Sequence, residues 1–237
     1  MPTIADLIYV VMFAIALPLL DYLYFWPQFR RRVTVDPVRA RRWFWAWAIF
    51  GAWPVVIAGA VLWSTNDRSW AELGFSIPDG WRLWTSIAVF LLLAIYFVYT
   101  VLALLWNSDS RASIRQQFEA FSSDLTDILP RTTSDMLWFA GVSLTAGFCE
   151  EFLFRGYLIW TLTPFVGWWA GAAVSALTFA FWHMYQGWSG VLRTGIVGLL
   201  FTLLVAIFDS LWPAIALHTL IDLGNGLIAQ QALRPTK

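Results

Sequence analysis

Residues 85–106 read TSIAVFLLLAIYFVYTVLALLW, and no side chain in this run carries a charge. At about 1.5 Å of rise per residue, a helix over the run is about 33 Å long, enough to cross the roughly 30 Å hydrocarbon core of a bilayer. Residues 43–63 form a second uncharged run of similar length. The two runs predict an all-α integral membrane protein.

The composition of the whole chain favours a bilayer as its solvent. Hydrophobic residues make up 59% of the 237 residues and charged residues only 13%, far from the balance of soluble proteins. The net charge is zero, so bulk electrostatics indicate no nucleic-acid partner. Many of the 17 Trp residues stand at the ends of apolar runs, where indole rings favour the headgroup region: Trp43, Trp63, Trp84, Trp106, Trp168 and Trp212.

Five weaker segments complete a predicted set of about seven transmembrane helices. They are expected at residues 4–26, 136–160, 168–182, 192–208 and 212–229. No small-residue cleavage site follows the first segment, so we expect it to be retained as a span, bent by Pro18. Ser134 or Asp135 is the expected N-cap of the helix that begins near Met136.

The spans divide the chain into three regions. Residues 1–135 form an N-terminal three-span region that ends in a polar connection, amphipathic around residues 114–121. Residues 136–230 form a C-terminal four-helix core, and residues 231–237 form a tail. The polar connection is the main part of the chain that we expect to lie outside the membrane.

The distribution of basic residues predicts the orientation. Alternating spans place only Arg68 and Arg82 on one side. The other side receives Arg30, Arg31, Arg32, Arg39, Arg41, Arg42, Arg111, Arg115, Arg131, Arg193, Arg234 and Lys237. Because basic loops remain on the cytoplasmic side, we expect an external N-terminus and a cytoplasmic C-terminus.

A small group of ionisable residues lies inside the predicted spans. Such residues cost roughly 2.5 to 3.5 kcal/mol each on insertion scales, so they need a structural or functional reason. Glu151 and Arg155 are separated by one helical turn and are expected to pair, whereas Glu150 is rotated by about 100° and is free to face a cavity. Within a membrane helix such a pair is often only a structural lock.

The only two histidines, His183 and His218, also fall in or beside the later spans, and Asp222 follows His218 by one helical turn. With Glu150 they make a plausible set for hydrolysis or for zinc. Each histidine alone is more often structural. Cys149, the single cysteine, is a possible nucleophile but reads more simply as a small core residue.

Three ordered segments resemble the motifs of the CAAX-protease and bacteriocin-processing family of intramembrane proteins. Residues 150–156, EEFLFRG, resemble its EExxxR signature; residues 179–183, FAFWH, are similar to its FxxxH motif; and residues 218–222, HTLID, resemble its HxxxN/D motif. The resemblance covers roughly residues 136–229. It implies a helical fold that places the site among the last four spans.

The resemblance also implies roles for the motif residues. Glu150 would be the general base with His183 as its partner, and His218 with Asp222 would stabilise the oxyanion. An ionised Asp222 beside an oxyanion would repel it unless the carboxyl were protonated or metal-bound, so two mechanisms stay open. The site either needs no cofactor or holds zinc on Glu150, His183 and His218.

The remaining motif positions, Glu151, Arg155 and Phe179, are expected to orient the site. Straight full-length helices would place His183 and His218 at different depths, so a tilt, a short span or an irregular segment near residues 186–190 must bring them together.

Three functions follow from these residues. The first is an endopeptidase that acts on a membrane-associated protein or peptide, possibly one with a CAAX-type prenylated tail. The second is a non-catalytic immunity or scaffold protein that retains the motif residues as a structural network. The third is a proton-coupled carrier, which is disfavoured because the acids cluster beside an arginine instead of following a path.

Overall fold

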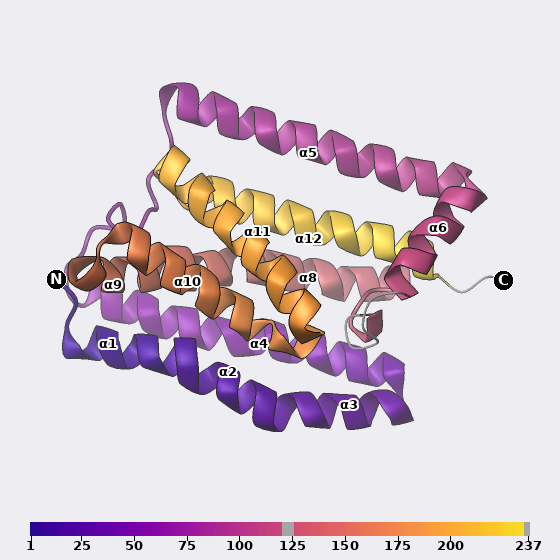
Figure 1. Cartoon of the computed structure of the whole chain (residues 1–237), viewed down its shortest axis with the longest axis horizontal. Coiled ribbons are helices and arrows are strands. Elements are labelled where there is room, and N and C mark those ends of the chain that lie inside the picture. Colours follow the sequence, from indigo (N-terminus) through magenta and orange to yellow (C-terminus); the bar gives the residue numbers. More distant parts are fainter. Residues whose placement is uncertain (120–125, 235–237) are drawn as a thin grey trace.

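The computed structural model describes residues 1–119 and 126–234, and within these ranges the chain is helical and contains no strand (Figure 1). Its α-helices are α1 (Ile4–Val11), α2 (Leu17–Leu20), α3 (Trp26–Val35), α4 (Pro37–Ser64), α5 (Gly80–Trp106), α6 (Ser108–Glu119), α8 (Thr133–Glu150), α9 (Ile159–Val166), α10 (Trp168–Trp182), α11 (Gly187–Phe208) and α12 (Trp212–Leu233). The π-helical segments are η1 (Met12–Ala16), η2 (Asp21–Phe25) and η3 (Glu151–Leu158), and η4 (Met184–Gln186) is a 3₁₀ turn.

The first span is one helical run from Ile4 to Val35, longer than the 4–26 segment expected from the sequence. Pro18 has no N–H to donate and would normally break the hydrogen bonding of an α-helix. Here Pro18 stands at the start of the short α2, between the two wide turns η1 and η2, and the helix continues through it. The chain then reverses at Asp36, whose side chain caps α4 by accepting hydrogen bonds from Val38 N and Arg39 N.

Among the residues that the structure describes, five helices are long and apolar enough to cross a bilayer: Ile4–Val35, Pro37–Ser64, Gly80–Trp106, Thr133–Val166 and Met184–Phe208. The other two helices of the expected seven are also formed. However, α10 has only 15 residues, and α12 carries the polar residues His218 and Asp222 and is not among the five. The fold is that of an all-α integral membrane protein with several passes.

The helix formed by α8, η3 and α9 lies in the middle of the bundle. It packs against α4 on one side and α12 on the other, and α5 packs on α12 (Figure 1). α10 packs on both α9 and α11. The N-terminal three-span region and the C-terminal core are therefore in direct contact, although the division into regions stays a prediction.

A buried ion pair fixes one end of the bundle. Asp6 is fully buried, and its two carboxylate oxygens accept hydrogen bonds from Arg68 Nη1 and Nη2 at 2.8 and 2.7 Å. The Tyr157 hydroxyl donates to the same carboxylate. Hydrogen bonding to Asp6 raises the pKa of Arg68, so this cation keeps its charge. The cluster ties α1 and the loop between α4 and α5 to η3.

The loop between α4 and α5 packs onto the same end of the core. Leu73 is 2% exposed, and the Phe75 ring lies among aromatic rings that include those of Phe152 and Trp212. The backbone of Gly74 accepts a hydrogen bond from Leu211 N at 2.8 Å, which joins the loop to the turn between α11 and α12.

Several sequence-based boundaries were wrong. Thr132, not Ser134 or Asp135, caps α8, because its side chain and that of Asp135 form a reciprocal capping box. α8 together with η3 and α9 runs to Val166, beyond the expected end at residue 160. The polar connection begins with α6, but part of the amphipathic segment at residues 114–121 lies outside the described residues. Of the expected tail at residues 231–237, the first three belong to α12, and residues 235–237 lie outside the described ranges.

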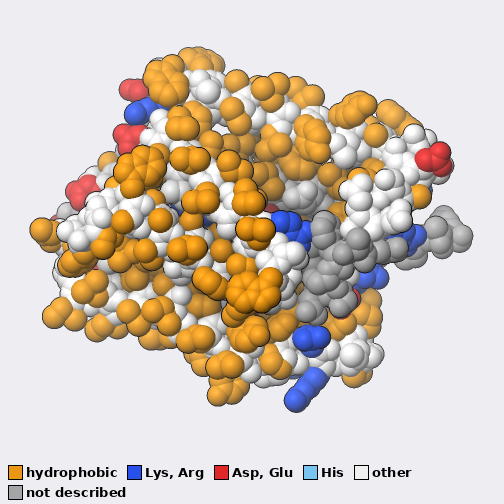
Figure 2. Space-filling view, in the orientation of Figure 1, with side chains coloured by type: hydrophobic (Ala, Val, Ile, Leu, Met, Phe, Trp, Pro, Cys, Tyr) orange, Lys and Arg blue, Asp and Glu red, His pale blue; other side chains and the backbone are white. Residues whose placement is uncertain are grey.

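Hydrophobic side chains cover most of the surface in Figure 2, as expected for a protein in lipid. Most of the basic side chains visible in Figure 2 lie toward the end where α3 meets α4, and most of the acidic ones lie toward the opposite end (Figures 1 and 2). The start of α1 and the end of α12 lie toward opposite ends of the long axis (Figure 1). This arrangement agrees with an odd number of spans, and the direction of insertion stays a prediction.

Candidate active site

The two adjacent glutamates stand where the central helix changes from α to π geometry. Glu150 is the last residue of α8, and Glu151 is the first residue of η3. A regular α-helix would turn their side chains about 100° apart. Both carboxylates nevertheless approach His218 of α12, each at a different ring nitrogen: Glu151 Oε1 lies 2.8 Å from Nδ1, and Glu150 Oε2 lies 3.7 Å from Nε2. Short π-helical segments are frequent at functional sites.

His218 is the centre of the polar cluster. Its Nε2 also lies 3.7 Å from Asp222 Oδ2, one turn further along α12. The imidazole ring stacks on the Phe201 ring of α11, with centroids 4.7 Å apart and an angle of 18° between the planes. With an apolar ring on one face and carboxylates at both nitrogens, His218 is held in one orientation.

Arg155 pairs with Glu151 as the sequence predicts. Its Nη1 lies 3.2 Å from Glu151 Oε1, and both side chains are fully buried. A second guanidinium nitrogen donates to the carbonyl oxygen of Gly198 on α11 at 3.0 Å, and the guanidinium lies 4.2 Å from the centre of the Phe179 ring. Phe179 therefore has the orienting position expected of it, in direct contact with the buried cation.

His183 ends α10, and its Nδ1 lies 2.9 Å from the carbonyl oxygen of Phe179. The Phe179 ring is 4.8 Å from the His183 ring and 6.3 Å from the His218 ring, so both histidines contact the same aromatic side chain. They reach similar depth because α10 is short and ends part-way along the bundle (Figure 1). A short span was one of the three solutions that the sequence left open.

The contacts within the site add to the pairs expected from the sequence. The resemblance implies His183 as the partner of Glu150, and this role stays a prediction; the imidazole that the structure places beside Glu150 is His218, at 3.7 Å. The sequence argument also treated Glu151 only as the partner of Arg155, whereas Glu151 binds His218 as well. Both contacts with His218 join residues more than 60 positions apart, which spacing along one helix cannot reveal.

Two contributors to the site were missed. Phe201 and the Gly198 carbonyl both belong to α11, a helix in which the sequence shows no polar motif. The sequence of α11 shows only that the helix is apolar. An apolar composition does not reveal which face of α11 contacts His218.

Residues 132–224 match the family model described as Rce1-like, Type II CAAX prenyl endopeptidase. Over these residues the chain is similar to the CAAX endopeptidase family. The matched range begins at the N-cap Thr132 and includes the three motif segments. No curated protein and no solved structure matches the chain. The description of this family names a prenyl endopeptidase, an enzyme that hydrolyses peptide bonds.

The expected zinc ligands do not form a group of three in the described part of the chain. In the described ranges, no group of three or more His, Cys, Asp or Glu side chains could hold a metal ion. Of the expected ligands Glu150, His183 and His218, the first and third approach each other, with Glu150 Oε2 3.7 Å from His218 Nε2.

Cys149 adjoins the EExxxR motif of the family but points away from its chemistry. Its side chain is fully buried in a hydrophobic cluster with Phe152, Phe154 and Tyr157. The surroundings favour the structural interpretation over the nucleophilic one.

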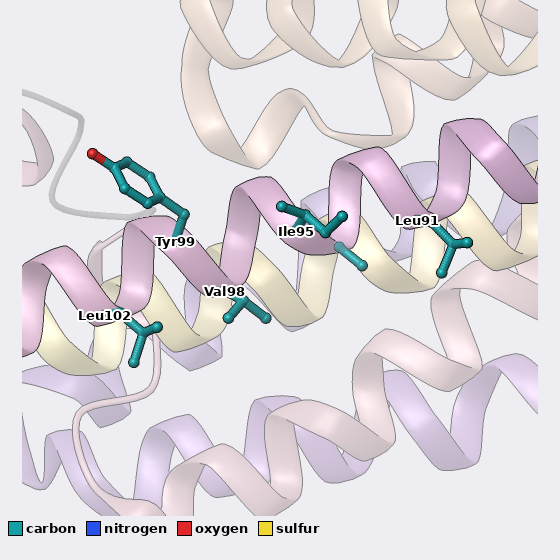
Figure 3. A pocket seen from close by; sticks show the side chains of 6 residues that line it. Leu91, Ile95, Val98, Tyr99 and Leu102 are labelled. Atoms are coloured by element: carbon teal, nitrogen blue, oxygen red, sulfur yellow. The ribbon is translucent and has the colours of Figure 1, made fainter.

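The apolar outer face of α5 is separate from the polar cluster. Figure 3 shows side chains along this face: Leu91, Ile95, Val98, Tyr99 and Leu102. Several of these side chains are among the most exposed on α5, including Ile95 at 64% and Tyr99 at 72%. In a bilayer this face contacts lipid.

Proposed function

We propose that the chain is an intramembrane endopeptidase that hydrolyses a peptide bond of a membrane-associated protein, with Glu150 as general base. The observation that carries the proposal is the convergence of Glu150, Glu151 and Asp222 on His218 inside a membrane bundle. The description of the matched family supports a CAAX-type prenylated tail as the substrate class.

The spacing around His218 suits an oxygen atom between the side chains. Its Nε2 lies 3.7 Å from Glu150 Oε2 and 3.7 Å from Asp222 Oδ2, which is too long for direct hydrogen bonds. A single oxygen atom fits at about 2.8 Å from both Nε2 and the Glu150 carboxylate. Glu150 Oε2 is buried and has no hydrogen-bond partner among the described residues, so it is available to such an oxygen.

A water molecule in this position would be the nucleophile. Glu150 accepts a proton from the water as its oxygen attacks the carbonyl carbon of the peptide bond. The N–H of a protonated His218 stabilises the oxyanion of the tetrahedral intermediate. Glu150 then returns the proton to the amide nitrogen, the C–N bond breaks, and an acid and an amine are formed.

Glu151 and Asp222 support His218 in this scheme. Glu151 accepts a hydrogen bond from Nδ1, which fixes the ring and stabilises its positive charge, as the carboxylate does in a catalytic triad. Asp222 balances the charge of the imidazolium from the other side. Its negative charge is therefore paired with His218 and need not repel the oxyanion.

His183 supplies a second imidazole for the substrate. Donation from Nδ1 to the Phe179 carbonyl fixes one tautomer, which leaves Nε2 as the acceptor of the ring. We assign to this nitrogen the binding of a substrate N–H or of the hydrolytic water.

The test is cleavage of peptides by the purified full chain in detergent. A panel of prenylated and unprenylated C-terminal peptides, analysed by mass spectrometry, should reveal one cleaved class. Glu150→Gln keeps the size of the side chain and should lower turnover by at least about 1,000-fold while the protein stays folded. His183→Ala should also abolish cleavage. Asp209→Asn, which changes an exposed acid at the end of α11, should cleave like the wild type.

Retained turnover in both Glu150→Gln and His183→Ala would overturn the proposal. Rescue of a cellular phenotype by Glu150→Ala would instead favour the scaffold function. A chelator should leave cleavage intact, whereas stoichiometric zinc and reversible loss of activity on chelation would replace this mechanism by a metal-dependent one.

A further inference from the structure

The turn between α3 and α4 carries the densest charge in the chain. Between residues 22 and 66 there are six arginines and a single acidic residue, Asp36. Asp36 is already occupied, because it caps α4 and pairs with Arg39 at 3.5 Å. The segment from residue 30 to residue 42 therefore has a net charge of +5.

One of these arginines, Arg41, is buried and contacts other parts of the fold, whereas the others are exposed. Arg41 is 3% exposed, lies 3.7 Å from Asp135 and donates to the carbonyl oxygen of Asp127. The members of a second group are exposed at the surface, and we call this group the hairpin arginines: Arg31, Arg32, Arg39 and Arg42.

The hairpin arginines lie where the hydrocarbon core must end. From Trp43 to Ser64, α4 has no charged residue, and these residues span about 33 Å, the thickness of the core. Arg39 and Arg42 belong to the two turns that precede this stretch. Figure 2 shows basic side chains projecting from this end of the molecule, beside the apolar surface. Their depth is that of the lipid headgroups.

Aromatic rings beside the turn hold at least one guanidinium group in place. The Arg32 guanidinium lies 4.2 Å from the centre of the Trp43 ring, and that ring is stacked on Phe25 at 4.3 Å. Stacking on an aromatic face leaves the N–H edges of a guanidinium free to bind an oxyanion. Arg42 makes one hydrogen bond, to the exposed Ser134 hydroxyl at 3.2 Å, which uses only part of its donor capacity.

We propose that the hairpin arginines form a binding site for the phosphate groups of anionic phospholipids. Arginine suits this ligand because its planar fork binds two phosphate oxygens at once. The position at the membrane edge favours a lipid headgroup over a free anion, and each arginine near an anionic surface contributes about 1 kcal/mol, or roughly fivefold in affinity.

The experiment uses the purified full chain in neutral detergent with a fluorescent phosphatidylglycerol as the probe. Anisotropy should report binding that unlabelled phosphatidylglycerol displaces and phosphatidylcholine does not. Replacing all four hairpin arginines by Gln should weaken binding at least tenfold. The control Arg82→Gln/Arg234→Gln removes two charges elsewhere and should bind like the wild type. Because the assay is in detergent, an altered direction of insertion does not affect it.

A second variant distinguishes loss of the binding site from loss of the fold. Replacing the four arginines by Lys keeps the charge, and this protein should retain more affinity than the Gln variant. Unchanged binding in a folded Gln variant, or equal displacement by phosphatidylcholine, would overturn the proposal. Equal displacement by inorganic phosphate or by an acidic peptide would refute the lipid assignment.

Discussion

The substitution Glu151→Gln tests two roles of this buried carboxylate, one in the stability of the fold and one in peptide cleavage. Glu151 is fully buried and accepts hydrogen bonds from Arg155 at 3.2 Å and from His218 at 2.8 Å. Glutamine keeps the shape but leaves the guanidinium as a buried charge without its partner. Breaking a buried pair in this way costs about 3 to 5 kcal/mol. At about 1.4 kcal/mol per factor of ten, the smaller figure is a change of more than about 100-fold in the unfolding equilibrium.

The assay is equilibrium unfolding in mixed micelles, followed by the helical circular dichroism signal, together with peptide cleavage. Glu151→Gln should lose both stability and turnover. The double variant Glu151→Gln/Arg155→Met removes both charges, and Met can contact the Phe179 ring as the guanidinium does. It should recover about 2 kcal/mol of stability, because no charge is left buried alone.

Turnover should not recover in the double variant. His218 would still have an oxygen acceptor at Nδ1 but would lack the negative charge that stabilises the imidazolium, so turnover should stay at least about 100-fold below that of the wild type. Glu72→Gln, a change at an exposed position of the loop between α4 and α5, is the matched control and should alter neither quantity. If the double variant regained cleavage along with stability, Glu151 would be only a partner for Arg155.

The remaining predictions concern packing and the end of the bundle. Tyr157→Phe removes the hydroxyl that donates to Asp6 and should lower the free energy of unfolding by about 1 kcal/mol, measured in the same micelles; an unchanged value would mean that this hydrogen bond adds nothing. Gly224→Ala places a Cβ 2.3 Å from the Phe97 ring and should destabilise by about 1 to 3 kcal/mol. Gly51→Ala meets no atom closer than 3.8 Å and should show no comparable loss.

The class of fold and the motif residues could be predicted because they depend on local patterns. Uncharged runs near 22 residues reveal α4 and α5 without any knowledge of their neighbours, and the spacing of four between Glu151 and Arg155 predicts their ion pair. The spacing of His218 and Asp222 likewise predicts that they face the same site.

Contacts that depend on the arrangement of several helices could not be predicted. Nothing in the sequence around Asp6 identifies Arg68 and Tyr157 as its partners, which follow it by 62 and 151 residues. The contact between Glu151 and His218 joins residues 67 apart. The position of His218 beside Glu150 likewise depends on the packing of α12 on α8.

The composition of α12 depends on its position in the bundle, next to the polar site. α12 is 22 residues long but is not among the helices that composition alone assigns to the membrane. Lipid requires apolar side chains only on the faces that it touches, and α12 packs on α8, α5 and α11. The central helix Thr133–Val166 has the lowest hydropathy of the five candidates, 1.3, and the largest buried share, 44%, whereas α5 has the highest, 2.7, and the smallest, 11%. The less lipid a helix meets, the more polar residues it can carry, so the weakest membrane signals belong to the two helices that hold the glutamates and His218.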